Sequence, residues 1–243
     1  MQKNTVKKNF SKAAEEYSRY AVNQEKVFKE IVKRLELLKN PHPLLDLGCG
    51  TAEGIKNYPK SFGIDISFKM CKKAKENLSF AVCAEGEKLP FKNESFKAVI
   101  SSFSLQWMEV EKAIREARRV LKKDGFFIVA VPVKGSLEEL FNAWQKAFLE
   151  TKGKKDALFQ FPDENKIFKT VKENFEIVEA GRKEYILFPE RVEEAVKFVT
   201  KIGAKNPHRP PLPLKSTVKR FKELFAQNCV IKYKVLFLTA KKV

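Results

Sequence analysis

The residues with the most distinctive chemistry form a short glycine-containing segment, DLGCGTAEG, at residues 46–54. Gly48 and Gly50 can adopt positive φ angles and let the backbone approach a ligand without an intervening Cβ. Asp46 stands two positions before the first glycine and places a carboxylate beneath the expected turn. Because an apolar run precedes this segment, we expect a loop at the carboxyl end of a strand, the edge where doubly wound sheets bind ligands.

The spacing of this loop excludes two common phosphate-binding patterns. A dinucleotide fingerprint needs a third glycine at position 53, but that residue is Glu53, whose carboxylate would repel a pyrophosphate. A P-loop needs a Gly-Lys-Ser/Thr sequence, which does not follow. The remaining pattern predicts a ligand with an adenosine, no phosphates and a cationic group that acidic surroundings favour, namely S-adenosylmethionine.

A second acidic residue supports a nucleoside ligand. Asp65 ends the next apolar run, 19 residues after Asp46, where a carboxylate can accept hydrogen bonds from both ribose hydroxyls. The alternative role for Asp65 is the N-cap of the following helix, but Ser67 is better placed for that role. We therefore expect Asp65 to bind a ribose.

A parallel sheet is needed to bring these acids and glycines together. Five short apolar runs predict strands, at residues 43–48, 61–66, 78–83, 96–101 and 125–132. Apolar residues at helical spacing predict helices around them, within residues 24–38, 68–78 and 113–121. This alternation predicts an α/β fold in which a buried parallel sheet carries helices on both faces.

The pattern changes after Pro132. Helices are expected at residues 135–148 and 191–203. Further strands, which we expect to complete the sheet, are predicted at residues 175–181, 183–188 and 230–240. The proline-rich segment 208–214, HRPPLPL, predicts a stiff loop, since proline fits neither a helix interior nor a central strand.

Five sequence blocks resemble, in order and spacing, the class I S-adenosylmethionine-dependent methyltransferases: LLDLGCGTAEG, FGIDIS, AEGEKLPF, FKAVISSFSLQW and RRVLKKDG. They cover most of residues 44–132. The resemblance implies a Rossmann-like fold with a mostly parallel seven-stranded sheet and additional lid or insertion helices. It further implies N-terminal lid helices in residues 1–40, a cofactor-binding core in 41–133, and acceptor-side insertions with the last strands in 134–243, all in one domain.

The resemblance also implies a set of cofactor contacts and no metal. The residues concerned follow the first four strands and are Asp46, Gly48, Cys49, Gly50, Asp65, Ile66, Glu85, Gly86, Ser101 and Ser102. Asp65 would contact the ribose, and Glu85 with Gly86 the adenine. Asp46, Gly48 and Gly50 would border the methionine part, and Ser101 and Ser102 would lie near its amino-acid end. The sequence departs from the family pattern at Ala52, where a third glycine is usual, and at Glu85, where Asp is commoner.

Blocks outside this core resemble a narrower family, the malonyl-acyl-carrier-protein O-methyltransferases of biotin synthesis. They are the N-terminal spacing from Phe10 to Gln24, SLQW, GSLEELFNAW and KIGA. This resemblance implies methyl transfer to the free carboxylate of a malonyl thioester on an acyl carrier protein, which gives the methyl ester that starts pimeloyl synthesis. Because a carboxylate is already ionised at neutral pH, no general base is required, in agreement with only two histidines in the chain.

No catalytic group is assigned, but several residues are candidates for placing the acceptor. Tyr17, Gln24 and Trp107 are expected to order the site, although Tyr17 and Trp107 suit ordinary apolar packing equally well. Candidates for a bidentate clamp on the acceptor carboxylate are Arg182, Arg191 and Arg209.

The chain is strongly basic, with 48 Lys and Arg against 30 Asp and Glu and a net charge of +18. This charge favours an acidic partner, and the acidic acyl carrier protein fits it. RNA is the alternative partner, but no Asn/Asp-Pro-Pro-Tyr/Phe motif follows the fourth predicted strand, so we expect no nucleic acid. A heat-adapted surface, another small-molecule acceptor and a non-catalytic cofactor-binding protein of the same fold also remain open.

Composition limits the class and location of the protein. Hydrophobic residues make up 44% of the 243 residues, which is typical of a globular chain. The four cysteines form no Cys-x-x-Cys pair, so we expect reduced thiols. Without an apolar run that could span a membrane or an apolar leader, we expect a cytoplasmic protein with no membrane partner.

Overall fold

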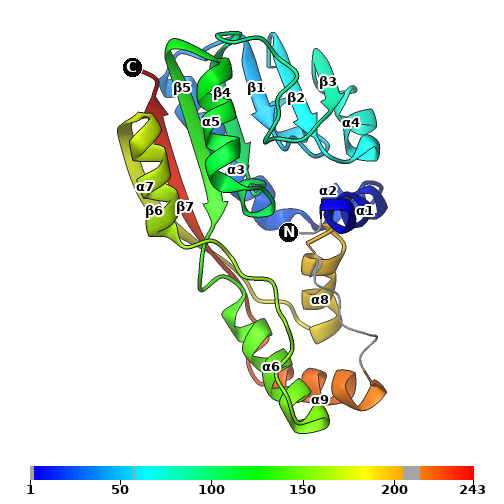
Figure 1. Ribbon diagram of the computed structural model, residues 1–243. Coiled ribbons are helices and arrows are strands. Elements are labelled where there is room, and N and C mark those ends of the chain that lie inside the picture. Colours follow the sequence, from blue (N-terminus) through cyan, green and yellow to red (C-terminus); the bar gives the residue numbers. More distant parts are fainter. Residues whose placement is uncertain (1–2, 57, 205–213) are drawn as a thin grey trace.

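The computed structural model describes residues 3–56, 58–204 and 214–243. Its centre is a seven-stranded sheet with the strand order β3-β2-β1-β4-β5-β7-β6 (Figure 1). The strands are β1 (Leu44–Leu47), β2 (Ser61–Asp65), β3 (Phe80–Cys83), β4 (Phe96–Ser102), β5 (Leu121–Pro132), β6 (Glu176–Leu187) and β7 (Ile231–Lys241). Strands β1 to β5 pair in parallel, whereas β7 is antiparallel to both β5 and β6. The predicted mostly parallel α/β fold is confirmed.

Helices cover both faces of the sheet and bury its continuous apolar runs. On one face, α3 (Val22–Leu37) buries Val27, Ile31 and Leu35, and α4 (Phe68–Ala74) lies on the same side. On the other face, α5 (Val110–Val120) packs beside α7 (Glu164–Asn174). The apolar period of α3 and α5 is the one that the sequence predicts, whereas α7 was not expected.

The expected alternation of strands and helices is incomplete around the site. Between β1 and β2 the described residues form only a short 3-10 turn, η1 (Glu53–Ile55), and residues 84–95 contain no helix. Both connections are short and contain a glycine and a proline, which do not favour a helix interior. The glycine loop therefore opens into a cavity and does not lead into a helix N-terminus.

Five more helices lie beyond the carboxyl ends of the parallel strands (Figure 1). They are α1 (Lys3–Ala13), α2 (Tyr17–Tyr20), α6 (Glu138–Lys152), α8 (Val192–Thr200) and α9 (Lys215–Ala226). Helices α6 and α9 pack through Trp144 and Phe221, whose ring centroids are 5.4 Å apart. Glu16, before α2, forms a 2.5 Å ion pair with Lys201, after α8. The N-terminal helices thus connect the sheet to the C-terminal helices.

Three further predictions concern the cysteines, a membrane span and the proline-rich loop. All four cysteines are free thiols, as expected. None of the helices in the described ranges combines the length and apolar character that a membrane span requires. Most of the predicted 208–214 loop lies outside the described residues.

Candidate active site

The glycine loop follows β1 and is fixed against the end of β4. Gly48 and Gly50 have φ angles of +80° and +53°, so both adopt the predicted left-handed conformation. Leu47 O accepts hydrogen bonds from the hydroxyls of Ser101 (3.1 Å) and Ser104 (2.6 Å). The two hydroxyls are themselves 2.6 Å apart. These hydrogen bonds join the carboxyl ends of β1 and β4. The Ser101 hydroxyl is engaged in this contact with Leu47 O and the Ser104 hydroxyl.

Asp65 is held at the end of β2 by two backbone groups. Gly50 N–H donates to its Oδ2 at 3.1 Å, and Ser67 N–H donates to its Oδ1 at 2.8 Å. Burial raises the pKa of Asp65 to about 6, although these hydrogen bonds act in the opposite direction. Ser67 caps α4 by accepting a hydrogen bond from Met70 N–H, as the sequence predicts. Asp65 is therefore available to face a ligand.

Asp46 is a second carboxylate beneath the glycine loop. It is only 2% exposed, and its Oδ1 has no hydrogen-bond partner among the described residues. Burial, and then the nearby charge of Asp65, raise the pKa of Asp46 to about 8. Ser102 Oγ is likewise buried without a partner. A buried acid that lacks a partner suits a cationic group, as in a sulfonium or ammonium ligand.

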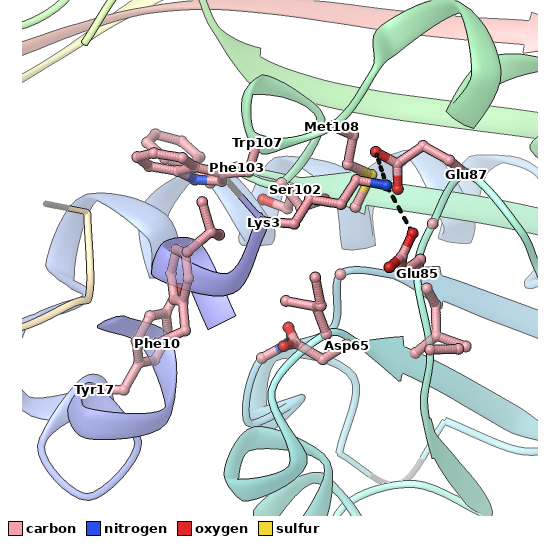
Figure 2. A pocket seen from close by; sticks show the side chains of 18 residues that line it. Lys3, Phe10, Tyr17, Asp65, Glu85, Glu87, Ser102, Phe103, Trp107 and Met108 are labelled. Carbon is pink, nitrogen blue, oxygen red and sulfur yellow. Dashed lines mark hydrogen bonds and ion pairs between the residues drawn. The ribbon is translucent and has the colours of Figure 1, made fainter. Parts of the chain in front are cut away.

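A cavity of about 660 Å³, part of which is open to solvent, lies between α1 and the ends of β1 to β4 (Figure 2). Seven of the ten predicted cofactor residues line it: Gly48, Gly50, Asp65, Ile66, Glu85, Gly86 and Ser102. Asp46 and Cys49 instead line an adjoining cavity between the glycine loop and α3. Ser101 lines neither cavity. We call the 660 Å³ space the cofactor cavity.

Helix α1 covers the cofactor cavity through contacts that sequence reasoning missed. Lys3 Nζ lies 2.7 Å from Glu85 Oε2 and 3.3 Å from Glu87 Oε1, and Figure 2 shows its side chain extending across the cavity. Farther along the helix, the hydroxyls of Ser11 and Ser67 are 2.9 Å apart. Because these partners lie more than 50 residues apart, no local sequence signal identifies them.

A second cavity, of about 580 Å³, adjoins the first. The two share four aromatic residues, Phe10, Tyr17, Phe103 and Trp107. The Trp107 ring meets Phe10 edge-on at 5.7 Å and stacks on Phe159 at 4.4 Å. No charged side chain occurs among the described residues that line this space, which we call the aromatic cavity. The polar side chains on its wall include those of Tyr17, Gln24 and Trp107, the three predicted acceptor residues.

The predicted arginine clamp is not assembled in the described part of the chain. Arg182 lies on β6 beside a separate cavity, where it forms a 2.5 Å ion pair with Glu164. Arg191 is exposed just before α8, and it lines neither the cofactor cavity nor the aromatic cavity. Arg209 lies outside the described residues. Across the described ranges, no three His, Cys, Asp or Glu side chains are grouped as metal ligands.

Comparisons with known proteins agree with this geometry. A family model described as a methyltransferase domain matches residues 45–129. An uncharacterized protein of Methanocaldococcus jannaschii, MJ1123, is 34% identical over 154 residues, which cover 62% of this chain and 73% of that protein. The malonyl-[acyl-carrier protein] O-methyltransferase of Alcanivorax borkumensis is 34% identical over 155 residues, which cover 59% of this chain and 53% of that protein.

The chain spans between 52% and 62% of the length of four curated relatives, the Alcanivorax protein included. Among solved structures, a Thermotoga maritima S-adenosylmethionine-dependent methyltransferase aligns with a TM-score of 0.58 at 18% identity. That alignment covers 97% of this chain and 99% of the other, and it shows a shared fold. Together with the glycine loop and the sheet order, these similarities show that the chain belongs to the class I S-adenosylmethionine-dependent methyltransferases.

Proposed function

We propose that the cofactor cavity binds S-adenosylmethionine, which supplies an electrophilic methyl group and leaves as S-adenosylhomocysteine. Asp65 accepts hydrogen bonds from the ribose hydroxyls, because its carboxylate is fixed at the cavity wall by two backbone N–H groups. Glu85 and Gly86 lie beside the adenine. Asp46 lines the adjoining cavity beneath the glycine loop, and its Oδ1 has no partner among the described residues. Its carboxylate favours the positive charge of a methionine end that extends toward this adjoining cavity.

The acceptor, in this proposal, is the free carboxylate of a malonyl thioester on an acyl carrier protein. The observation that carries this assignment is the uncharged aromatic cavity directly beside the cofactor cavity. The described lining offers aromatic rings and the neutral polar side chain of Gln24, between which a carboxylate can be held beside the methyl donor. The relatives named malonyl-[acyl-carrier protein] O-methyltransferase support the same acceptor.

The residues of the chain act by positioning and by excluding water. Phe10, Trp107 and Phe159 form a continuous aromatic wall where the two cavities meet. In a water-poor space the attraction between a carboxylate and a cationic methyl donor is strong, and transfer neutralises both charges. The carboxylate attacks without losing a proton, so the wall needs no base. Orientation of the two reactants therefore supplies most of the rate enhancement.

The charge of the protein supports the macromolecular partner. An excess of 18 positive charges produces a field that attracts an acidic carrier protein and speeds their association. Salt screens this field over about 8 Å at physiological ionic strength. We therefore expect added salt to raise the KM for the carrier protein while the KM for the cofactor changes little.

Steady-state kinetics with matched acceptors tests this function. Malonyl and acetyl thioesters of the same carrier protein differ only in the terminal carboxylate, and malonyl-coenzyme A retains that carboxylate without the carrier protein. We expect turnover of malonyl carrier protein, none of the acetyl form, and a higher KM for the coenzyme A thioester. Equal rates with malonyl and acetyl carrier protein, or no turnover of either, would contradict the proposal.

A further inference from the structure

Two tyrosines from distant parts of the chain meet in the aromatic cavity. Tyr17 begins α2, and Tyr233 lies on β7. Both line the cavity, and Tyr17 also lines the cofactor cavity. The Tyr17 ring lies over the glycine loop, with its Cε1 and Cζ atoms 3.9 and 4.0 Å from where a Cβ on Gly50 would stand. Tyr17 is thus located at the junction of the two cavities.

The Tyr233 ring is fixed by its aromatic neighbours. It meets Phe103 edge-on, with centroids 5.2 Å apart, and Phe161 edge-on at 6.4 Å. Only 3% of the residue is exposed. Phe103 lines both cavities, so its contact with Tyr233 places the Tyr233 ring next to a residue of the same junction. The two rings come from the covering helices and from the sheet, respectively.

Both phenols are neutral hydrogen-bond donors. Burial raises the pKa of Tyr17 and of Tyr233 above the usual range, and the nearness of Tyr17 raises that of Tyr233 further. No hydrogen bond to another described residue involves either hydroxyl, whereas the nearby Gln106 already donates to Phe103 O at 2.8 Å. The cavity therefore contains two O–H groups that donate to no other described residue and can donate to a ligand.

We propose that the hydroxyls of Tyr17 and Tyr233 bind the acceptor carboxylate, and that Tyr233 selects an acyl group that ends in a carboxylate. This inference rests on the proposed function and assigns the acceptor site within it. Two phenols can donate one hydrogen bond to each carboxylate oxygen, and such charge-assisted bonds are stronger than neutral ones. Unlike an arginine clamp, they hold the carboxylate without cancelling the charge that makes it a nucleophile.

Binding to the enzyme loaded with S-adenosylhomocysteine tests the inference without relying on turnover. Calorimetry would compare malonyl-pantetheine with acetyl-pantetheine for the wild type and for Tyr233→Phe, which keeps the ring. We expect the wild type to prefer the malonyl probe, and the variant to bind it about 10- to 100-fold more weakly. Affinity for S-adenosylhomocysteine should change less than twofold.

Tyr185→Phe is the matched control. Tyr185 lies on β6, its hydroxyl is buried without a partner among the described residues, and it lines neither cavity. We expect this variant to bind both probes as the wild type does. If Tyr233→Phe does not fold, the ultraviolet absorption of the tyrosines in the wild-type protein is measured with each probe instead. It should shift to longer wavelength with malonyl-pantetheine and not with acetyl-pantetheine, and no such difference would overturn the inference.

The possible failures are distinguishable. If the wild type binds and methylates malonyl acceptors and Tyr233→Phe binds them equally well, the inference is overturned and the proposed function stands. If the wild type binds malonyl-pantetheine no better than acetyl-pantetheine and methylates neither carrier thioester, the proposed function fails and the inference fails with it. If Tyr185→Phe loses as much affinity for malonyl-pantetheine as Tyr233→Phe does, the loss is a general effect of removing a hydroxyl, and the inference is overturned.

Discussion

Substitution of the two loop glycines by alanine should have clearly different effects. At Gly48 a Cβ would lie 2.6 Å from Ser104 Oγ and closer still to Ser104 Cβ, at a φ of +80°. Left-handed strain costs about 1–3 kcal/mol, and overpacking about 1–3 kcal/mol more. Displacing Ser104 also weakens its hydrogen bond to Leu47 O, worth about 1 kcal/mol. Gly48→Ala should therefore destabilise the fold by about 3–7 kcal/mol.

Gly50→Ala is the matched comparison. The φ of +53° is closer to the left-handed minimum, and the nearest atoms to an added Cβ are those of Tyr17, at 3.9 Å, which is ordinary van der Waals contact. Only left-handed strain remains, about 1–2 kcal/mol. Urea unfolding of both variants measures the difference, which should be at least about 2 kcal/mol. Equal destabilisation would refute the argument that Ser104 packing makes Gly48 the more demanding position.

The remaining predictions concern the cofactor cavity. Asp65→Asn should weaken S-adenosylhomocysteine binding by about 1.5–3 kcal/mol by calorimetry, because charge-assisted hydrogen bonds to the ribose are lost; an unchanged affinity would refute the ribose role. Since the pKa of Asp65 is about 6, its carboxylate is ionised above that pH, and affinity should fall as pH drops from 7 to 5. The affinity of Asp65→Asn should change less between pH 7 and pH 5 than that of the wild type. If the two proteins show the same pH dependence, a group other than Asp65 causes it. Lys3→Ala removes two partly exposed ion pairs, so stopped-flow experiments should show faster S-adenosylhomocysteine release with a fall in Tm of less than about 3 °C. An unchanged release rate would show that Lys3 does not hold α1 closed.

Features that depend on neighbouring residues could be predicted from the sequence. The positive φ angles of Gly48 and Gly50 follow from residue type, and the N-cap role of Ser67 follows from its position at the start of a helix. The strands were predictable because parallel strands are buried on both faces and appear as continuous apolar runs. The strand order agrees with the resemblance of five sequence blocks to one family.

Features that depend on distant residues could not be predicted. The contact of Lys3 with Glu85 joins residues 82 positions apart, and Tyr233 is indistinguishable in sequence from other aromatic residues of a strand. The arginine candidates were chosen because guanidinium groups bind carboxylates in a bidentate manner. Of these, Arg182 instead pairs with Glu164 at a remote edge, and Arg209 lies outside the described residues. From the sequence we expect a cationic side chain to bind the acceptor carboxylate, whereas the described residues of the aromatic cavity include neutral hydrogen-bond donors.

The central claim is that the methyl group reaches the carboxylate oxygen of a malonyl thioester. The most direct measurement incubates the enzyme with methyl-labelled S-adenosylmethionine and malonyl carrier protein, and then treats the isolated product with mild base. A methyl ester releases its label as volatile methanol under these conditions, and we expect all of the transferred label to be recovered in this form. Label that stays on the protein after base treatment, or equal labelling of acetyl carrier protein, would contradict the account.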